Sequence, residues 1–268
     1  MESMETSSAT WRHPVRARLQ AGETVLGVTI TTSSVEAAAQ AATLGFHFLW
    51  VEMEHSPITL ETLRNIVLAT RALPAAVFAR VPVIELWTAK RVMDQGVAGV
   101  VFPFCSSPEL AQKAVFACRY PPHGRRGSGA GLATFTWPDQ ENYYDSADQN
   151  MFTVVMIEEA SAVDQIEEIA ATPGVDVIFI GTSDLSFSLG LRGRQNETQL
   201  QEAIAKVVAA GRKHGKFLGR PAASADQIAK YREQGFQFFQ MQTELGLMRL
   251  GAKALGLEPV PLSIRALY

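Results

Sequence analysis

The feature that most constrains the fold is an alternation of short apolar runs with helix-like segments, which repeats eight times along the chain. Runs of four to eight apolar residues bounded by turn residues are typical of buried parallel strands. The apolar runs span 25–31, 46–53, 75–81, 98–104, 154–158, 177–184, 216–220 and 236–242. The expected helices span 34–44, 59–73, 88–95, 108–120, 161–172, 198–214, 225–234 and 245–255, with a short one from 185.

This rhythm predicts an α/β protein, a (β/α)8 TIM barrel formed as a single domain by residues 13–268, after a disordered leader at 1–12. A short helix at 14–21 is expected before the first strand. The alternative is an open doubly wound sheet, which would begin with a glycine-rich phosphate-binding turn. The first turn instead reads Thr31-Thr32-Ser33-Ser34, and this favours the barrel.

Composition excludes several classes of function. The net charge of −3 and the lack of a basic run argue against a nucleic-acid surface. The apolar stretches are too short for a membrane span, and the polar N-terminus lacks the pattern of a secretory signal. The two cysteines form neither a disulfide framework nor a spaced zinc motif. A cytoplasmic protein without nucleic-acid or membrane partners is therefore expected.

Two neighbouring runs end in a carboxylate, Glu158 and Asp184. In a parallel barrel both would lie at the end where active sites are built. Two carboxylates with no cationic partner nearby in the sequence indicate a divalent ion held by oxygen ligands. In the alternative interpretation, one caps the following helix and the other is a solvated loop acid.

The ends of the other expected strands add polar and charged side chains, which suit chemistry on an anionic substrate. These are Glu52, Glu54 and His55 after the second strand, Arg80 on the third, Arg220 on the seventh, and Gln240, Gln242 and Glu244 on the eighth. A Schiff-base aldolase would need a lysine at this rim, but the lysines fall on helices, apart from Lys216, which begins a strand. Without such a lysine, a bound metal ion would be needed to stabilise negative charge on a carbonyl oxygen.

Several motifs together resemble the HpcH/HpaI aldolase/citrate lyase family, over most of the chain from about residue 15 onward. They are Glu54-His55-Ser56-Pro57, Phe78-Ala79-Arg80-Val81, Arg119-Tyr120-Pro121-Pro122-His123-Gly124-Arg125-Arg126-Gly127, Ile157-Glu158 and Phe179-Ile180-Gly181-Thr182-Ser183-Asp184-Leu185-Ser186. The resemblance is to the branch of metal-dependent class II pyruvate aldolases that act on 4-hydroxy-2-oxo acids and 2-keto-3-deoxy sugar acids. It implies retro-aldol cleavage to pyruvate, or an analogue, and an aldehyde.

The resemblance also implies roles for the residues that match its motifs. Glu158 and Asp184 would ligate Mg²⁺ or Mn²⁺, with Co²⁺ or Zn²⁺ as possibilities, and pyruvate would chelate the ion. The backbone N–H groups of Ser183 and Asp184 would hold the carboxylate of pyruvate, as helix N-termini hold anions. Arg80 would stabilise the enolate.

His55 would act with water as the acid or base for the 4-hydroxyl proton. Asp94 would lie near that histidine, from a neighbouring subunit of a hexamer, a trimer of dimers that exchange C-terminal helices. Glu52 stands where the family usually has Asp, so its longer side chain is expected to shift His55. Arg126 would bind substrate or pin its own loop, and Arg220 would meet a polar or anionic aldehyde portion.

Other interpretations stay open from the residues. Arg80 could pair structurally with Glu52 or Glu158, and His55 could be a third metal ligand. The enzyme could instead decarboxylate oxaloacetate and use the enolate, as the related macrophomate synthase does, or act on an acyl-CoA. Met156, where the family often has Gln, and the altered end of the eighth strand support a non-catalytic barrel that binds an oxo acid.

Overall fold

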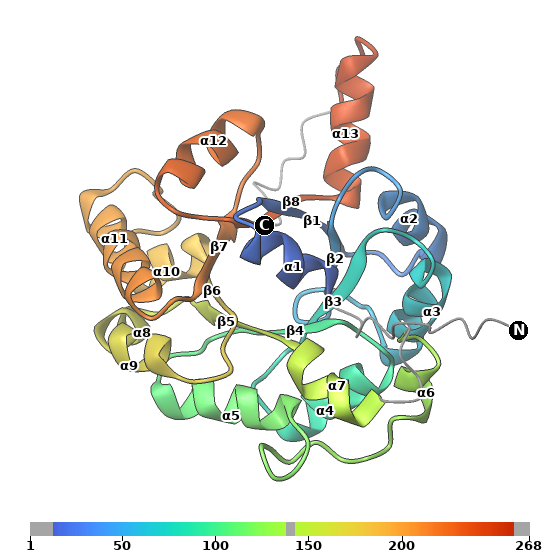
Figure 1. Ribbon diagram of the computed structural model, residues 1–268. Coiled ribbons are helices and arrows are strands. Elements are labelled where there is room, and N and C mark those ends of the chain that lie inside the picture. Colours follow the sequence, from blue (N-terminus) through green and yellow to red (C-terminus); the bar gives the residue numbers. More distant parts are fainter. Residues whose placement is uncertain (1–12, 138–142, 260–268) are drawn as a thin grey trace, which may run out of the picture.

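Eight parallel strands form a closed barrel in the order β1 to β8, so the predicted fold is confirmed (Figure 1). We describe residues 13–137 and 143–259 of the computed structural model. The strands are β1 (Val25–Ile30), β2 (Phe48–Glu52), β3 (Ala76–Arg80), β4 (Gly99–Phe102), β5 (Phe152–Ile157), β6 (Val177–Ile180), β7 (Phe217–Pro221) and β8 (Phe238–Thr243). The expected leader at 1–12 lies outside the described residues.

Helices surround the barrel and alternate with its strands. They are α1 (Pro14–Gln20), α2 (Val35–Ala41), α3 (Leu60–Thr70), α4 (Leu86–Asp94), α5 (Pro108–Cys118), α6 (Gly131–Thr134), α7 (Tyr143–Asn150), α8 (Ala160–Asp164), α9 (Ile166–Ala171), α10 (Thr182–Ser188), α11 (Thr198–Lys213), α12 (Ala225–Glu233) and α13 (Glu244–Ala254). Ser or Thr side chains cap the N-termini of α2, α3, α5, α12 and α13. Such caps satisfy backbone N–H groups that the helix itself leaves unpaired.

Three segments differ from the expectation. The helix expected at 161–172 is broken at Gln165, between α8 and α9. The segment 121–150, where no helix was expected, contains α6 and α7. The run at 177–184 is a strand only to Ile180, and α10 begins at Thr182. Asp184 therefore lies in the first turn of a helix rather than at the end of a strand.

Side chains alternate between the inside of the barrel and the layer beneath the helices, as the two-residue period of a strand requires. Large aromatic residues fill the inside, among them Phe48, Phe78, Phe179 and Phe238. The intervening residues of the strands pack against the helices in a second, larger cluster. Gly27 leaves room for one of these rings, because a Cβ atom at this position would lie 2.1 Å from the ring of Phe48.

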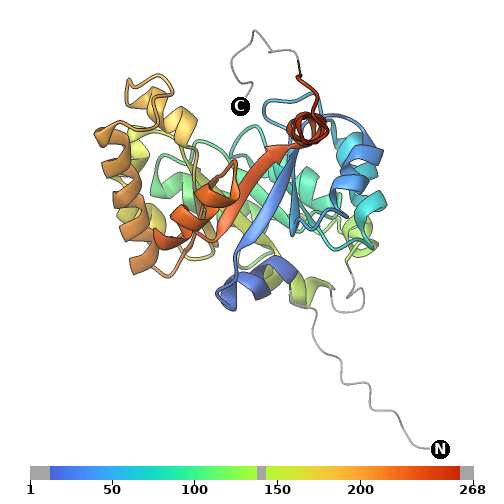
Figure 2. The ribbon, with the colours of Figure 1, turned by 90° about the horizontal axis from the view of Figure 1, so that it is seen from above.

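The amino end of the barrel is closed by α1, which lies across it (Figures 1 and 2). Val15 and Leu19 of α1 are buried among the aromatic side chains inside the barrel. Arg16 forms an ion pair of 2.5 Å with Asp176, next to the start of β6. Of the two ends, the carboxyl end of the barrel is therefore the one that the described helices leave open for a site.

The last helix, α13, stands away from the barrel (Figure 1). Glu244 is its one buried residue, while Leu245, Met248, Leu250 and the adjoining Leu255 are exposed. None of the helices in residues 13–137 and 143–259 combines the length and the apolar character needed to cross a membrane.

Candidate active site

Three inward-facing side chains mark the carboxyl end of the barrel. Glu52 follows Trp50 on the inner face of β2, and Arg80 follows Phe78 on the inner face of β3. The two residues are paired in the β2–β3 register. Glu158 comes directly after β5 and continues the inner row of Val154 and Met156. All three are almost completely buried, so their charges must be compensated within the protein.

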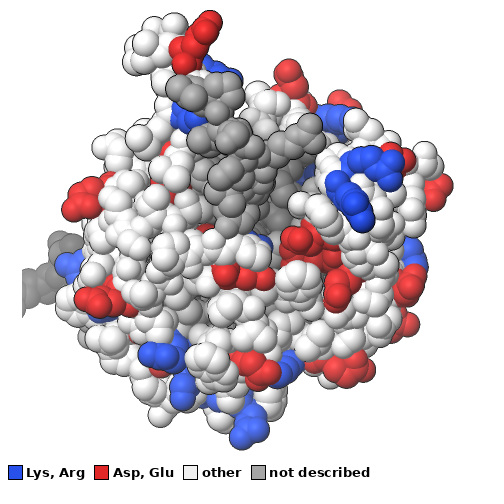
Figure 3. Space-filling model, turned by 180° about the vertical axis from the view of Figure 1, so that it is seen from behind, with Lys and Arg blue, Asp and Glu red and all other residues white. Residues whose placement is uncertain are grey.

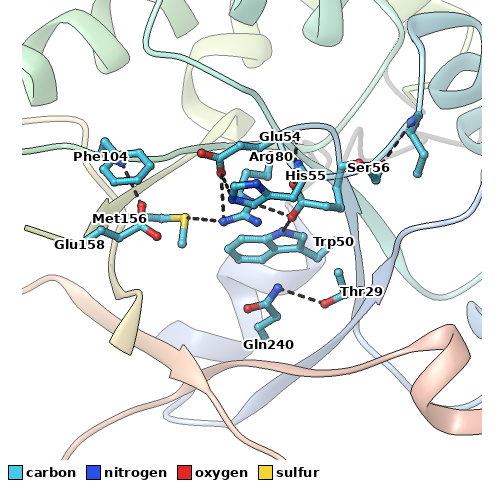
Figure 4. Close-up of polar contacts among 12 residues, drawn as sticks. Thr29, Trp50, Glu54, His55, Ser56, Arg80, Phe104, Met156, Glu158 and Gln240 are labelled. Carbon is cyan, nitrogen blue, oxygen red and sulfur yellow. Dashed lines mark hydrogen bonds and ion pairs between the residues drawn. The ribbon is translucent and has the colours of Figure 1, made fainter. Parts of the chain in front are cut away.

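Arg80 is held in one place by two carboxylates (Figure 4). Its Nε lies 2.6 Å from Glu52 Oε2, and its Nη1 lies 3.1 Å from Glu54 Oε2. Nη1 also contacts the sulfur of Met156 at 3.9 Å, and the guanidinium carbon lies 5.9 Å from the centre of the Trp50 ring. Of the two structural partners that the sequence offered, Arg80 pairs with Glu52.

The Glu52 carboxylate also shapes the loop that follows β2. Its Oε1 accepts hydrogen bonds from the backbone N–H groups of Glu54 at 2.8 Å and His55 at 3.1 Å. Its Oε2 accepts a hydrogen bond of 3.3 Å from Trp50 Nε1 in addition to the contact with Arg80. Glu52 therefore fixes both the guanidinium and the backbone that carries His55. This is the role of a positioning residue.

His55 reaches outward from this loop beside Glu54. Its Nε2 lies 3.5 Å from Glu54 Oε2, and its side chain is 42% exposed. Burial raises the pKa of Glu54, Arg80 and His55 oppose the rise, and the charges of Glu52 and Asp184 add to it. Glu54 had no assigned role in the sequence analysis. Its position in the sequence, between Glu52 and His55, could have indicated a role for Glu54.

Glu158 receives support from the neighbouring loop. Its Oε2 accepts a hydrogen bond of 2.9 Å from the backbone N–H of Phe104. Phe104 has a φ of 50°, in the left-handed region that few residues other than glycine adopt. A Cβ atom at Gly181 would lie 2.5 Å from Glu158 Oε1, so the approach of α10 to this carboxylate requires a glycine.

The electrostatics of Glu158 favour a cation beside it. Burial, together with the negative charges of Glu54 and Asp184, raises the pKa of Glu158 to about 7, against the opposing effects of the Phe104 N–H and Arg80. Asp184 therefore lies near enough to interact with both Glu54 and Glu158. A bound cation would favour the ionised form of Glu158 and relieve the repulsion.

The donor set suits some metal ions better than others. Within residues 13–137 and 143–259 no three His, Cys, Asp or Glu side chains gather as a complete set of metal ligands. Mg²⁺ is commonly bound by one or two carboxylates while water and substrate supply its other ligands. Glu158 and Asp184 therefore fit Mg²⁺ or Mn²⁺. Zn²⁺ is served less well, because its sites usually hold three or four protein ligands.

Asp94 and Arg126 form a separate cluster, away from the mouth of their own barrel. Asp94 ends α4, which runs back from the carboxyl end of β3 to the amino end of β4. Arg126 Nη2 lies 3.6 Å from Asp94 Oδ1 and donates a hydrogen bond of 2.8 Å to the hydroxyl of Tyr143. Burial raises the pKa of Asp94, and Arg126 opposes the rise. One chain does not bring Asp94 to its own His55.

Arg220 does not point into the barrel. Phe217 and Gly219 occupy the inner face of β7, so Arg220 lies on the outer face beside Leu218. Its guanidinium carbon is 3.5 Å from the centre of the Tyr231 ring and 5.2 Å from that of Phe236. Burial lowers its pKa. This arginine therefore packs outside the barrel over Tyr231, whereas it was expected at the rim.

Comparisons with known proteins match most of the chain. Residues 26–249 match the model of the family described as HpcH/HpaI aldolase/citrate lyase. A hydroxypyruvate/pyruvate aldolase of Paraburkholderia phytofirmans is 32% identical over 254 residues, which cover 92% of this chain and 98% of the relative. A 5-keto-4-deoxy-D-glucarate aldolase of Klebsiella pneumoniae is 33% identical over 251 residues, or 92% of this chain and 97% of the relative.

A solved structure shows the same fold. The crystal structure of an HpcH/HpaI aldolase/citrate lyase family protein from Burkholderia cenocepacia has a TM-score of 0.83 at 32% identity, and the match covers 91% of this chain and 98% of that one. The chain therefore belongs to the HpcH/HpaI aldolase/citrate lyase family, a family of divalent-metal-dependent aldolases, and is an enzyme of the carbon–carbon lyase class.

Proposed function

We propose that the protein cleaves a 4-hydroxy-2-oxo acid reversibly to pyruvate, or a close analogue, and an aldehyde. The observation that carries this proposal is the buried Arg80, fixed by Glu52 and Glu54 within reach of the Glu158 charge and next to the loop of His55. The relatives named as aldolases of hydroxypyruvate, pyruvate and a keto-deoxy sugar acid support the same chemistry.

Glu158 and Asp184 are the residues that would hold the divalent ion, Mg²⁺ or Mn²⁺. When bound there, such an ion supplies Lewis-acid stabilisation of negative charge on the oxygen of a 2-oxo group. The backbone N–H groups of Ser183 and Asp184 belong to the first turn of α10, where a helix leaves its donors unpaired. They are suited to the carboxylate of the oxo acid.

Arg80 supplies the fixed positive charge for the enolate. Nε and Nη1 contact the two glutamates, and no hydrogen bond from Nη2 to another described residue is seen. Nη2 is thus available to donate a charge-assisted hydrogen bond to the oxygen on which charge develops. Because Glu52 and Glu54 hold the guanidinium in place, little reorganisation is needed when that charge appears.

His55 is placed to move the proton. In cleavage it takes the proton of the 4-hydroxyl group, directly or through water, while that oxygen becomes the carbonyl of the aldehyde. The electron pair of the C3–C4 bond passes into the oxo acid and forms the enolate. Protonation at C3 then gives pyruvate. Glu54 Oε2 lies 3.5 Å from His55 Nε2, beside the group that moves the proton.

Exchange of the methyl protons of pyruvate in D₂O, followed by NMR, tests the enolate step without an aldehyde. We expect exchange with Mg²⁺ or Mn²⁺ and none with a chelator. Glu158→Gln should slow exchange by at least about a hundredfold, because it removes charge from the metal site. Glu159→Gln, a change at the next and more exposed residue, is the matched control. Absence of exchange in folded wild-type protein with either metal would exclude the pyruvate-aldolase function.

We also propose that the protein is a homo-oligomer, a hexamer built as a trimer of dimers that exchange α13. The support is the apolar surface of this helix, where Met248 is 70% and Leu255 is 81% exposed. In this assembly Asp94 would approach the His55 of a neighbouring subunit. Sedimentation velocity should show the hexamer, and Met248→Glu should reduce it to smaller species, whereas Lys253→Glu, which removes no apolar surface, should not. A monomeric wild-type protein would contradict the assembly.

A further inference from the structure

The side of the mouth formed by β8 and β1 carries a pair of neutral polar residues. Gln240 follows Phe238 on the inner face of β8, and Thr29 lies on the inner face of β1. Gln240 Nε2 donates a hydrogen bond of 3.1 Å to Thr29 Oγ1. Figure 4 shows the pair beside the Trp50 ring, on the side away from Glu54. Neither residue has a role in the enolate chemistry.

Among the residues that the structure describes, none closes off the space above this pair. Phe238 is fully buried, whereas Gln240, two residues further along the same inward face, is only half-buried. An inward-facing side chain in a closed barrel can be exposed only if the interior is empty above it. Thr29 is 4% exposed and anchors the glutamine from one side. The pair therefore lines the carboxyl mouth of the barrel, next to its aromatic core.

The remaining hydrogen-bonding capacity of the pair matches a hydroxyl group. Thr29 Oγ1 accepts from Gln240, so its own hydrogen is free to be donated elsewhere. Among the residues that the structure describes, none donates to Gln240 Oε1. The pair thus offers an acceptor and donors side by side. A hydroxyl group, which both donates and accepts, satisfies both.

Within residues 13–137 and 143–259, this side of the mouth has no charge available for a substrate. Arg220, the nearest cationic candidate, is packed outside the barrel over Tyr231. Glu244 is buried and accepts hydrogen bonds from the backbone N–H groups of Thr31 at 2.8 Å and Thr32 at 2.6 Å. An anionic group would find no positively charged partner among the described residues here, and an apolar group would leave the glutamine amide unpaired, which carries a cost.

We propose that Thr29 and Gln240 form a hydroxyl-binding subsite that determines which aldehydes the enzyme uses. This inference rests on the proposed aldolase function. In a closed barrel of eight strands β1 lies opposite β5, so Thr29 faces the side that carries Glu158. The oxo-acid end of the substrate belongs with Glu158, Asp184 and Arg80. The far side therefore receives the aldehyde portion, and the subsite favours an aldehyde that carries a hydroxyl group.

The test compares three acceptors with pyruvate as donor: glyceraldehyde, butanal and 4-oxobutanoate. Wild-type enzyme should show the highest kcat/KM with glyceraldehyde. Gln240→Met, which keeps the length of the side chain but removes its hydrogen bonds, should lower kcat/KM for glyceraldehyde about tenfold to hundredfold and change that for butanal less than about threefold. Thr29→Val should have a smaller effect of the same kind. Gln237→Met, the same change at the amino end of β8, is the matched control.

Three outcomes would overturn the inference. The first is an equal loss for glyceraldehyde and butanal, which would indicate a general disturbance of the pocket. The second is a wild-type preference for 4-oxobutanoate. The third is a loss of kcat/KM in Gln240→Met that appears only with hydroxypyruvate as the donor and butanal as the acceptor. The subsite would then bind the hydroxyl group of the donor.

Exchange of pyruvate protons separates this result from the proposed function. Unchanged exchange in Gln240→Met beside a selective loss with glyceraldehyde would support the subsite. The dissociation constant of glyceraldehyde, measured by NMR line broadening on the pyruvate-loaded proteins, should be higher for Gln240→Met than for wild type. If wild-type protein shows no exchange, the aldolase function fails, whereas normal exchange without altered selectivity rejects only the subsite.

Discussion

The two ends of the barrel interior both contain buried polar groups, but of opposite kinds. At the carboxyl end Glu52, Arg80 and Glu158 form a charged network that is completed by Glu54. At the amino end the buried His13 is neutral at ordinary pH, because burial and the nearby charge of Arg16 lower its pKa to about 3. It packs edge-on against Phe78, with ring centroids 5.6 Å apart, and caps α1 by accepting the Arg16 N–H.

The difference shows where the protein tolerates the cost of buried charge. A buried ion pair contributes little net stability, because desolvation offsets much of the attraction. The charged network therefore stands at the open end, where chemistry uses it, while a neutral group and an apolar helix close the other end. In barrels of this kind residues at the carboxyl end serve function and those at the amino end serve stability. Substitutions at the two ends should separate these properties.

The largest effect is expected from Arg80→Met. Loss of the fixed positive charge should lower kcat for aldol cleavage by about 10²–10³-fold, as removal of a preorganised donor to an oxyanion does. The variant also leaves Glu52 and Glu54 without their cationic partner, so the melting temperature in the absence of metal should fall. Steady-state kinetics and thermal unfolding measure the two effects separately.

Arg91→Met on the exposed face of α4 is the control for this change, since it removes one positive charge without touching the network. We expect it to alter kcat less than about twofold, as for a solvent-exposed charge. If Arg80→Met kept its activity while losing stability, Arg80 would be a structural partner of Glu52 only, and the enolate would need another source of charge.

The contrast between Arg80 and Arg220 shows what the sequence could and could not predict. Both arginines lie at the ends of strands, and both strands were expected from their apolar runs. Both faces of such strands are buried, so the apolar pattern does not reveal which residues face inward. Arg80 shares the inward face with Phe78, whereas Arg220 shares the outward face with Leu218. The register of the closed barrel decides the matter, and it is a property of all eight strands together.

The same limit applies to the loops after the strands. The sequence led to Glu158 because the residue follows the strand directly. It placed Glu54 at the rim but gave it no role, because the contact of Glu54 with Arg80 depends on how Glu52 folds the loop through two backbone N–H groups. Asp184 was expected at the end of a strand, yet α10 begins two residues earlier. Gly181, just before this helix, lies against Glu158 of the preceding strand-to-helix connection, a contact between distant residues that local patterns do not contain.

A smaller effect, confined to stability, is expected from His13→Asn. The folded protein holds the histidine neutral down to about pH 3, whereas the unfolded chain takes up a proton near the ordinary pKa of 6.5. Stability linked to His13 is therefore complete above about pH 6.5 and is lost as the pH falls toward 3. Between pH 7 and pH 5 the wild-type protein should lose about 2 kcal/mol in the free energy of unfolding from this group.

Asparagine can cap α1 in place of His13 but does not titrate, so the variant should show a loss about 2 kcal/mol smaller over the same pH interval. Urea unfolding at pH 7 and pH 5, at one protein concentration, measures the difference. His123→Asn, an exposed position, should retain the wild-type pH dependence, and both variants should keep wild-type kcat at pH 7. Equal pH dependence in wild type and His13→Asn would mean that the amino end admits a charged histidine. The contrast between a charged mouth and a neutral base would then be lost.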